Sequence, residues 1–182
     1  MNKSTRGRLV LVCIVALFAI PLTAAFLMHA SGWQPLRTTQ SGILVQPPQD
    51  VSAAPVTLAD GSRYAWQDPQ YRWTLVMLPG TDCAQNCRTR LDEVLRMRIT
   101  LGSNAERLRV LYLGPALPRD FLAARAPLAA GRDDSGAFAF ARAQDADDLA
   151  LALVDPRGNL MLRYAGGYSA QGLRSDVMKI IY

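Results

Sequence analysis

The feature that most constrains this chain is an uncharged apolar stretch of twenty residues near its N-terminus, residues 9–28. A helix of about that length spans the roughly 30 Å hydrocarbon core of a bilayer. Lys3, Arg6 and Arg8 precede the stretch. Because basic residues tend to stay on the cytoplasmic side, the pattern predicts a cytoplasmic tail at 1–8, a transmembrane helix at 9–28 and a body beyond the membrane.

A cleaved signal peptide is the alternative interpretation of this stretch. Its apolar region is shorter, about 7–15 residues, and ends at a small-x-small cleavage site. Residues 27–29, Leu-Met-His, do not provide such a site. We therefore favour an uncleaved anchor. Residues 29–60 contain repeated Pro and Gly, and we expect an extracytoplasmic linker in which 43–45 form at most a short docking strand.

The charge of the body limits the classes of partner. The chain has 20 basic and 15 acidic residues. Three of the basic residues lie before the apolar stretch, so the remainder is nearly balanced. Its arginines are scattered and lack the aromatic interleaving of an RNA-binding surface. Nucleic acid is therefore not an expected partner.

The body, residues 61–182, alternates between strand-like and helix-like segments. Short apolar, β-rich runs are typical of buried strands, and apolar residues at helical spacing are typical of amphipathic helices. The expected order is strand 71–78, helix from 82–83 to 101, strand 108–113, helix 118–130, loop 131–136, short strand 138–141, strand 149–154, antiparallel strand 160–164 and helix 169–182. This order predicts an α/β, thioredoxin-like domain, a mixed sheet flanked by helices.

Two cysteines, Cys83 and Cys87, stand where the first expected strand gives way to a helix. A spacing of four places two helical side chains on one face, with Cα atoms about 6 Å apart. That distance is within the range of a disulfide and also lets two thiolates reach one soft metal ion. The pair is therefore the candidate catalytic site, Cys83 and Cys87, and a tentative copper site.

The surroundings of Cys83 favour a thiolate. Thr81 or Asp82 is expected to cap the helix, and the helix dipole stabilises negative charge at its first turn. Arg88 and Arg90 add positive potential nearby. Together these features predict a lowered pKa for the Cys83 thiol.

Three interpretations of the pair remain open: redox or copper chemistry, a structural disulfide, or coincidence. A disulfide across so few residues closes a very small loop, so its entropic stabilisation is small. The third cysteine, Cys13, lies in the membrane segment, where it is expected to be an ordinary small apolar residue.

The anchor, the Cys-x-x-x-Cys after a strand and the Val-Asp-Pro-x-Gly-Asn-Leu hairpin at 154–160 resemble the Sco (SenC/PrrC) family. The segment at 42–48, Gly-Ile-Leu-Val-Gln-Pro-Pro, and Met97-Arg98 are closer still to a bacterial membrane group associated with oxidase assembly. The resemblance implies a thioredoxin-like copper chaperone for cytochrome c oxidase, with copper as a possible cofactor and an oxidase subunit or assembly factor as partner. It also implies a single-pass protein of the bacterial inner membrane, with its C-terminal domain in the periplasm.

The chain departs from the Sco pattern at two places. Ala84 stands where Sco proteins have Pro, and the family's copper-binding His corresponds to Asp147. A carboxylate is a hard ligand, whereas Cu(I) prefers thiolate or imidazole. Asp147 and Asp148 are expected to be solvated acids before a strand. Three methionines can supply a thioether only if folding brings one close, and each is expected to be a packing residue: Met77, Met97 and Met161.

Two functional hypotheses follow. In the first, the chain assists oxidase maturation, either by attack of Cys83 on a partner disulfide with resolution by Cys87, or by passing Cu(I) from both thiolates. In the second, the body is a non-catalytic docking module of the oxidase assembly machinery, braced by a structural disulfide. A peroxidase is a minor third option, because the Pro-x-x-x-Thr-x-x-Cys pattern is absent around Cys83.

Overall fold

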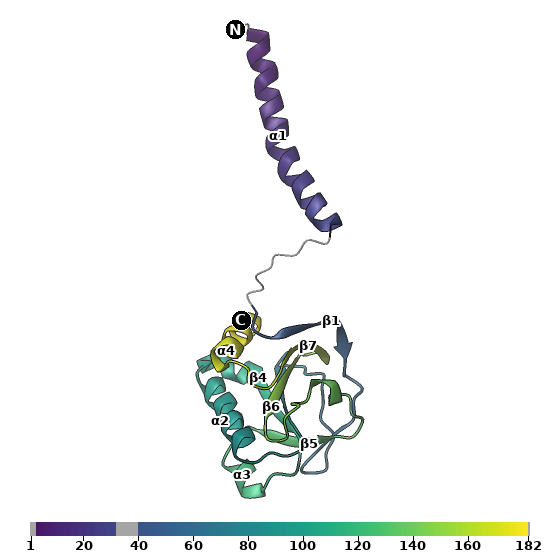
Figure 1. The fold of residues 1–182 in the computed structure, drawn as a ribbon, viewed down its shortest axis with the longest axis vertical. Helices are drawn as coiled ribbons and strands as arrows, with labels where there is room; N and C mark the ends of the chain where they lie inside the picture. The colour runs from purple at the N-terminus through teal and green to yellow at the C-terminus, as the bar shows by residue number, and fades with distance from the viewer. Residues whose placement is uncertain (1–2, 32–39, 182) are drawn as a thin grey trace. The chain divides into compact units, whose positions relative to one another are not determined.

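The computed structural model describes residues 3–31 and 40–181. Contacts between Cα atoms divide the chain into two units, with the boundary between Thr39 and Gln40 (Figure 1).

The first unit is a single helix, α1, Lys3–Ala30. The segment from Arg6 to Ala30 is long and apolar enough to cross a membrane. Pro21 lies inside the helix, as membrane helices tolerate. A helix is therefore present at 9–28 as expected, and it begins earlier, so that Arg6 and Arg8 are helical as well. That it spans a membrane stays a prediction.

The second unit is built on one mixed sheet in the order β1-β7-β6-β3-β4-β5-β2. The three strands β3, β4 and β5 are parallel, and the other neighbours are antiparallel. The strands are β1 Ile43–Asp50, β2 Val56–Leu58, β3 Trp73–Pro79, β4 Leu108–Leu113, β5 Ala129–Asp133, β6 Leu149–Val154 and β7 Asn159–Tyr164.

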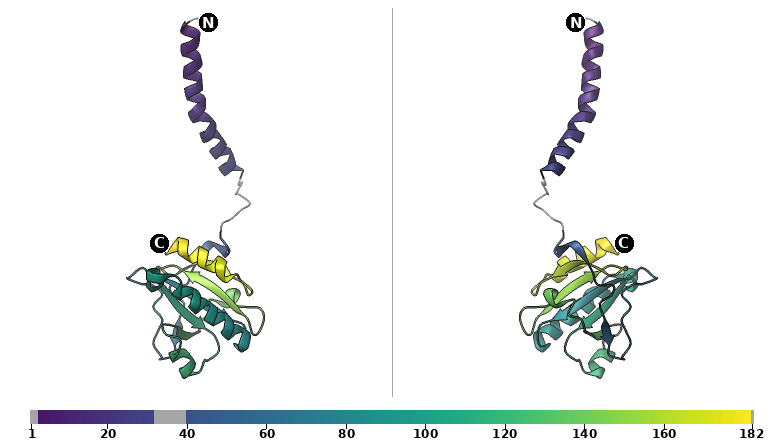
Figure 2. Two further views of the ribbon diagram at one scale, coloured as in Figure 1. Left: turned by 90° about the vertical axis from the view of Figure 1, so that its left-hand side faces the viewer. Right: turned by 90° about the vertical axis from the view of Figure 1, so that its right-hand side faces the viewer.

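Two helices, α2 Gln85–Ile99 and α4 Ala170–Ile180, cover the same face of the sheet (Figure 2). The remaining helical segments are short: η1 Gly102–Arg107, α3 Arg119–Ala123 and η2 Ala139–Ala141. The opposite face is covered by loops and side chains such as Trp66 and Phe138, whose rings stack 5.2 Å apart.

The central strands are buried on both sides because each contributes to two cores. In β3, Leu75 and Met77 pack under α2 and α4, whereas Val76 and Leu78 pack on the opposite face. Successive side chains of a strand point to opposite faces, so a nearly continuous apolar run is what a central strand requires. The thioredoxin-like α/β fold is confirmed, and the strands expected at 108–113 and 149–154 have those bounds.

The domain boundary expected at residue 61 is wrong. The segment predicted to be a linker supplies both edge strands of the sheet: β1 pairs with β7, Leu44 opposite Leu162, and β2 pairs with β5. The compact unit begins at Gln40. An edge strand has one neighbour only, which is why β1 tolerates two prolines that would break a central strand.

Two further elements differ from expectation. Of the helix expected at 118–130, only α3 is helical. Ala129 and Ala130 belong instead to β5, which pairs in parallel with β4. The strand expected at 138–141 is the 3-10 turn η2. Phe138 is fully buried in the loop-covered core and Phe140 is exposed, so the alternating pattern reflects a turn rather than a strand.

Candidate functional site

The cysteine pair follows the C-terminal end of β3, a central strand of the sheet. β3 stops at Pro79, and α2 begins at Gln85 after the N-cap residue Ala84. Cys87 is therefore in the first turn of α2, whereas Cys83 precedes the helix, which begins later than expected. The two sulfur atoms form a disulfide, with Cα atoms 5.0 Å apart. Cys13, in contrast, is a free cysteine.

The disulfide is almost completely covered by protein. Cys83 retains 4% of its exposure and Cys87 none. Both belong to the core under α2, together with Leu91 of the same helix and Tyr112 of β4. Burial raises the pKa of the Tyr112 phenol to about 12, so this hydroxyl stays protonated at neutral pH. Cys83 is the less deeply buried of the two cysteines, and its neighbours along the chain, Asp82 and Ala84, are exposed.

The carboxylate of Asp147, in the loop before the neighbouring strand β6, caps the first turn of α2. Its Oδ1 accepts hydrogen bonds from the backbone N–H groups of Ala84, at 2.8 Å, and Cys87, at 3.0 Å. Its Oδ2 accepts from the N–H of Asn86, at 2.9 Å. Hydrogen bonds from the Cys87, Asn86 and Ala84 N–H groups lower the pKa of this carboxyl below its usual value.

Two expectations about this turn are therefore wrong. Asp147 is not merely a solvated acid, because it satisfies three of the N–H groups that a helix start leaves free. Neither Thr81 nor Asp82 is the N-cap; the cap is Ala84, whose side chain accepts no hydrogen bond. The Oδ1 atom of Asp82 accepts instead from the N–H of Cys83, at 2.7 Å.

Backbone contacts hold the two loops of the site together. The Asn86 side-chain amide donates to the carbonyl of Asp147 at 2.8 Å, and the Asp82 N–H donates to the carbonyl of Ala146 at 3.0 Å. A Cβ atom at Gly80 would collide with the carbonyl of Asp145. This close approach requires glycine at position 80, and it brings the loop before β6 against the loop before α2.

The antiparallel register explains why Asp147 arrives at this place. Pro79 of β3 pairs with Leu149 of β6, so the residues before β6 run alongside those after β3. A sequence signal existed in principle, an acid two residues before a strand. It becomes informative only once that strand is known to pair next to the cysteine strand.

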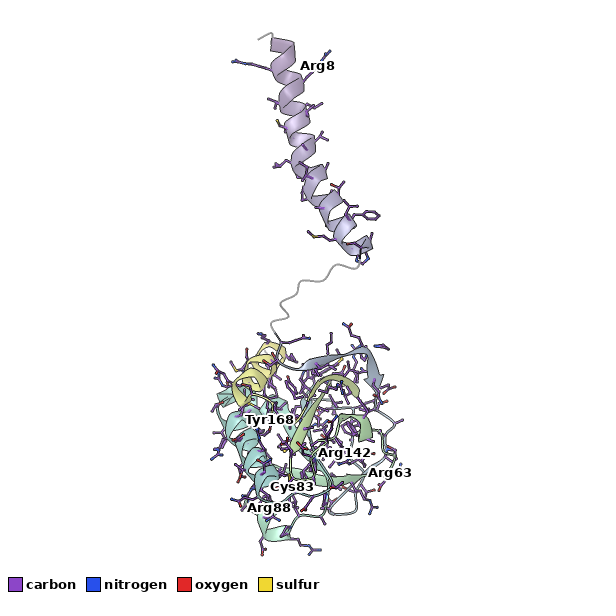
Figure 3. The ribbon with its side chains drawn as sticks, in the orientation of Figure 1. Arg8, Arg63, Cys83, Arg88, Arg142 and Tyr168 are labelled. Carbon is purple, nitrogen blue, oxygen red and sulfur yellow. A yellow bond between two sulfur atoms is a disulfide. The ribbon has the colours of Figure 1, made fainter. Side chains whose placement is uncertain are left out.

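The arginines next to the cysteines have different roles. The Arg88 Nε donates to the carbonyl of Cys83 at 3.1 Å, and Cys83 and Arg88 both lie around the start of α2 (Figure 3). Arg90 turns to Tyr168: its guanidinium lies 5.4 Å from the centre of that ring and donates to the Tyr168 carbonyl at 3.2 Å. Arg88 therefore contacts the cysteine loop, and the positive charge expected there from Arg90 is engaged elsewhere.

The donor set does not fit a resident copper ion. Among the residues described, no group of three His, Cys, Asp or Glu side chains is arranged to hold a metal. The two sulfur atoms are bonded to each other, and the nearby Asp147 carboxylate is a hard ligand engaged by three N–H groups. Met77 and Met97 are buried among the apolar side chains under α2. What the pair can do without metal is exchange its disulfide with another thiol or disulfide.

Solved structures of known proteins share this fold. Yeast Sco1 with copper bound has a TM-score of 0.56 and 13% identity, covering 80% of this chain and 94% of that one. BsSco, of the Sco family of cytochrome c oxidase assembly proteins, has a TM-score of 0.52 and 15% identity, covering 75% and 96%. The bacterioferritin comigratory protein of Xanthomonas campestris, studied for alkyl peroxide reduction, has a TM-score of 0.50 and 14% identity, covering 78% and 97%.

At these identities the likeness shows the fold alone. No curated protein sequence matches the chain. The model of one family, described as transmembrane-like, thioredoxin-like, C-terminal domain, matches residues 73–181, which is more than half of the chain and contains both cysteines of the disulfide. The chain therefore belongs to this transmembrane-like, thioredoxin-like family.

Proposed function

We propose that this protein is a membrane-anchored thiol–disulfide exchange protein that assists cytochrome c oxidase assembly. The observation that carries the proposal is the Cys83–Cys87 disulfide at the start of α2, at the edge of a thioredoxin-like sheet. Exchange chemistry needs only these two sulfur atoms. Copper handling would be helped by a third ligand, and among the described residues no group of three His, Cys, Asp or Glu side chains is arranged to hold a metal.

The proposed reaction begins with the reduced pair. The Cys83 thiolate attacks a disulfide of the partner, forms a bond with one partner sulfur and releases the other as a thiolate. Cys87, after losing its proton, attacks the Cys83 sulfur and releases the first partner sulfur. The partner disulfide is thereby reduced, and Cys83–Cys87 ends in the oxidised form. A dithiol electron donor must then reduce the pair for another cycle.

In this proposal the protein lies in a bacterial inner membrane with its body in the periplasm, and the N-terminal segment supports that orientation. α1 is long and apolar enough to span a bilayer, and the basic residues lie at its N-terminal end, Lys3, Arg6 and Arg8. Basic residues favour the cytoplasmic side. With residues 1–8 inside and 9–28 in the membrane, the body lies outside the cytoplasm, where disulfides persist.

The proposed partner is an oxidase subunit or another assembly factor. It is supported by the Sco-like fold and by the described role of BsSco in a family of cytochrome c oxidase assembly proteins. It is also supported by the sequence motifs around the cysteines and the hairpin at 154–160.

A second candidate function is favoured by burial. Because Cys87 is fully covered and Cys83 is 4% exposed, the disulfide is also suited to brace a docking surface without exchanging. In that case the body binds the oxidase machinery non-catalytically. For exchange, the exposed loop around Cys83 must shift to admit a partner sulfur.

Replacing both cysteines, Cys83→Ser with Cys87→Ser, separates these functions. The variant is expressed as the full chain in the bacterium of origin, with Cys13→Ser as the matched control and with protein level and folding checked. Thiol exchange predicts loss of most oxidase activity in membranes that hold normal amounts of folded variant. Unchanged oxidase activity would support the docking function instead.

A further inference from the structure

We propose that Asp147 sets the reduction potential of the Cys83–Cys87 pair by occupying the N–H groups at the start of α2. This proposal rests on the exchange function and concerns the same site. Asp147 is a positioning residue, because its hydrogen bonds are to the backbone N–H groups of Ala84, Asn86 and Cys87 and to the Asn86 side chain.

The N–H groups at a helix start are the natural partners of a cysteine thiolate. In proteins with strongly oxidising cysteine pairs, such groups and the helix dipole stabilise the thiolate of the reduced form. Here the N–H groups of Ala84, Asn86 and Cys87 donate to Asp147 at 2.8–3.0 Å. A thiolate formed on reduction would have to displace the carboxylate or do without these hydrogen bonds.

The charge of Asp147 acts in the same direction. A carboxylate near a thiolate disfavours the thiolate, because like charges repel. The hydrogen bonds that hold the carboxyl also lower its pKa, so it is ionised at neutral pH. The disulfide itself is neutral and is not repelled. Asp147 therefore favours the oxidised pair over the reduced one.

Other charged side chains near the site include Asp82, Arg88 and Arg142, which donates to the Leu113 carbonyl at 2.8 Å. Asp82 accepts the N–H of Cys83 and adds a second negative charge on the loop before the helix. Arg88 donates to the Cys83 carbonyl and opposes both acids. The carboxylate of Asp148, the neighbour of Asp147, accepts instead from the N–H of Leu149 in β6, at 2.7 Å.

The consequence is a direction for the exchange reaction. A pair whose disulfide is favoured has a more negative reduction potential, and its reduced form gives up two electrons more readily. The site is thereby adjusted to reduce a partner disulfide rather than to oxidise partner thiols.

The test is a redox equilibrium with glutathione on the full chain in detergent at pH 7. All samples carry Cys13→Ser, so that Cys83 and Cys87 are the only thiols. Two glutathione thiols reduce the disulfide to two cysteine thiols and become glutathione disulfide. We expect Asp147→Asn to raise the equilibrium constant for this reduction by about tenfold, or about 30 mV for two electrons. Asp148→Asn, the matched control with the same loss of charge, should leave it near the parent value.

The proposal would be overturned if the equilibrium constant for reduction of Asp147→Asn were equal to that of the parent or lower. An equal rise of this constant in Asp148→Asn would also overturn it. Circular dichroism checks folding. Asn keeps one acceptor oxygen where the carboxylate has two, so at least one α2 N–H group loses its acceptor together with the negative charge. If the Asn variant does not fold, Asp147→Ser is measured in its place, with the same shift expected. If neither folds, Asp147 is a structural residue and the proposal fails. Because no partner is present, this outcome is independent of the double-serine experiment.

Discussion

Two carboxylates, those of Asp147 and Asp176, accept backbone hydrogen bonds in different surroundings. The comparison shows when such a contact affects only stability and when it can also affect a reaction. Asp147 is partly exposed and caps α2 beside a disulfide. Asp176 of α4 is 2% exposed and accepts from the N–H groups of Ser41, at 2.7 Å, and Gly42, at 2.9 Å. Each joins segments that are far apart in the sequence.

The surroundings determine what each carboxylate can influence. The Oδ2 atom of Asp176 also accepts from the Tyr164 hydroxyl at 3.2 Å, and a Cβ atom at Gly42 would lie 2.7 Å from that tyrosine ring. These contacts hold residues 41 and 42 against α4 and β7, and the groups that make them are backbone N–H groups and a phenol. Asp147 lies beside a bond that can break and re-form, so the same type of contact can change a chemical equilibrium there.

The largest expected effect is on stability, at the buried carboxylate. Asp176→Ala leaves three buried or partly buried donors without their acceptor, which should cost about 3 kcal/mol in the free energy of unfolding. Thermal unfolding should occur roughly 10 °C lower. Asp176→Asn keeps an acceptor oxygen and should lose much less, and Asp147→Ala should also have a smaller effect. Equal losses at Asp147 and Asp176 would remove the distinction between them.

A second expected effect concerns metal binding at the position of Asp147, the partly exposed carboxylate. Asp147→His would supply an imidazole where the resemblance to Sco proteins implies one. Because imidazole is a suitable ligand for copper and carboxylate is not preferred by Cu(I), we expect the reduced variant to bind Cu(I) about tenfold more tightly. Competition with a chromophoric Cu(I) chelator measures this, with Asp148→His as the control. A gain in both variants would show that position 147 is not special.

The smallest expected effect is a pH dependence of stability. The pKa of Asp147 in the folded protein is lowered by the N–H groups of Cys87, Asn86 and Ala84. Its contribution is therefore complete above its ordinary pKa of about 4 and is lost as pH falls through the lowered value. Thermal unfolding between pH 7 and pH 3 should show a shallower acid decline in Asp147→Asn than in the parent. An identical decline would mean that these hydrogen bonds do not stabilise the fold.

Local patterns predicted the strands that are almost entirely buried. The apolar runs at 108–113 and 149–154 were sufficient to predict β4 and β6 with their bounds, because both faces of these strands are covered. The hairpin after β6 followed from Asp155 and Gly158, since Gly158 has φ of +93° and the Asp155 carboxylate accepts from the Asn159 N–H. These signals act within a few residues.

Elements at the margins of the sheet could not be predicted in the same way. β1 contains two prolines and has only β7 as its neighbour, so its sequence resembles a linker. Ala129 and Ala130 favour a helix by composition but lie against β4. Pairing with a distant strand outweighed the local preference in both cases.

By itself, the sequence determined an apolar helix, an alternating α/β body and two cysteines close enough to bond, because spacing and apolar periodicity are local properties. Only the tertiary structure decided that the bond is nearly buried, that the body begins at Gln40 and that Asp147 caps the cysteine helix. These features depend on which strands pair and in what register. Such pairing brings together groups about 60 residues apart, a relation that no local pattern in the chain records.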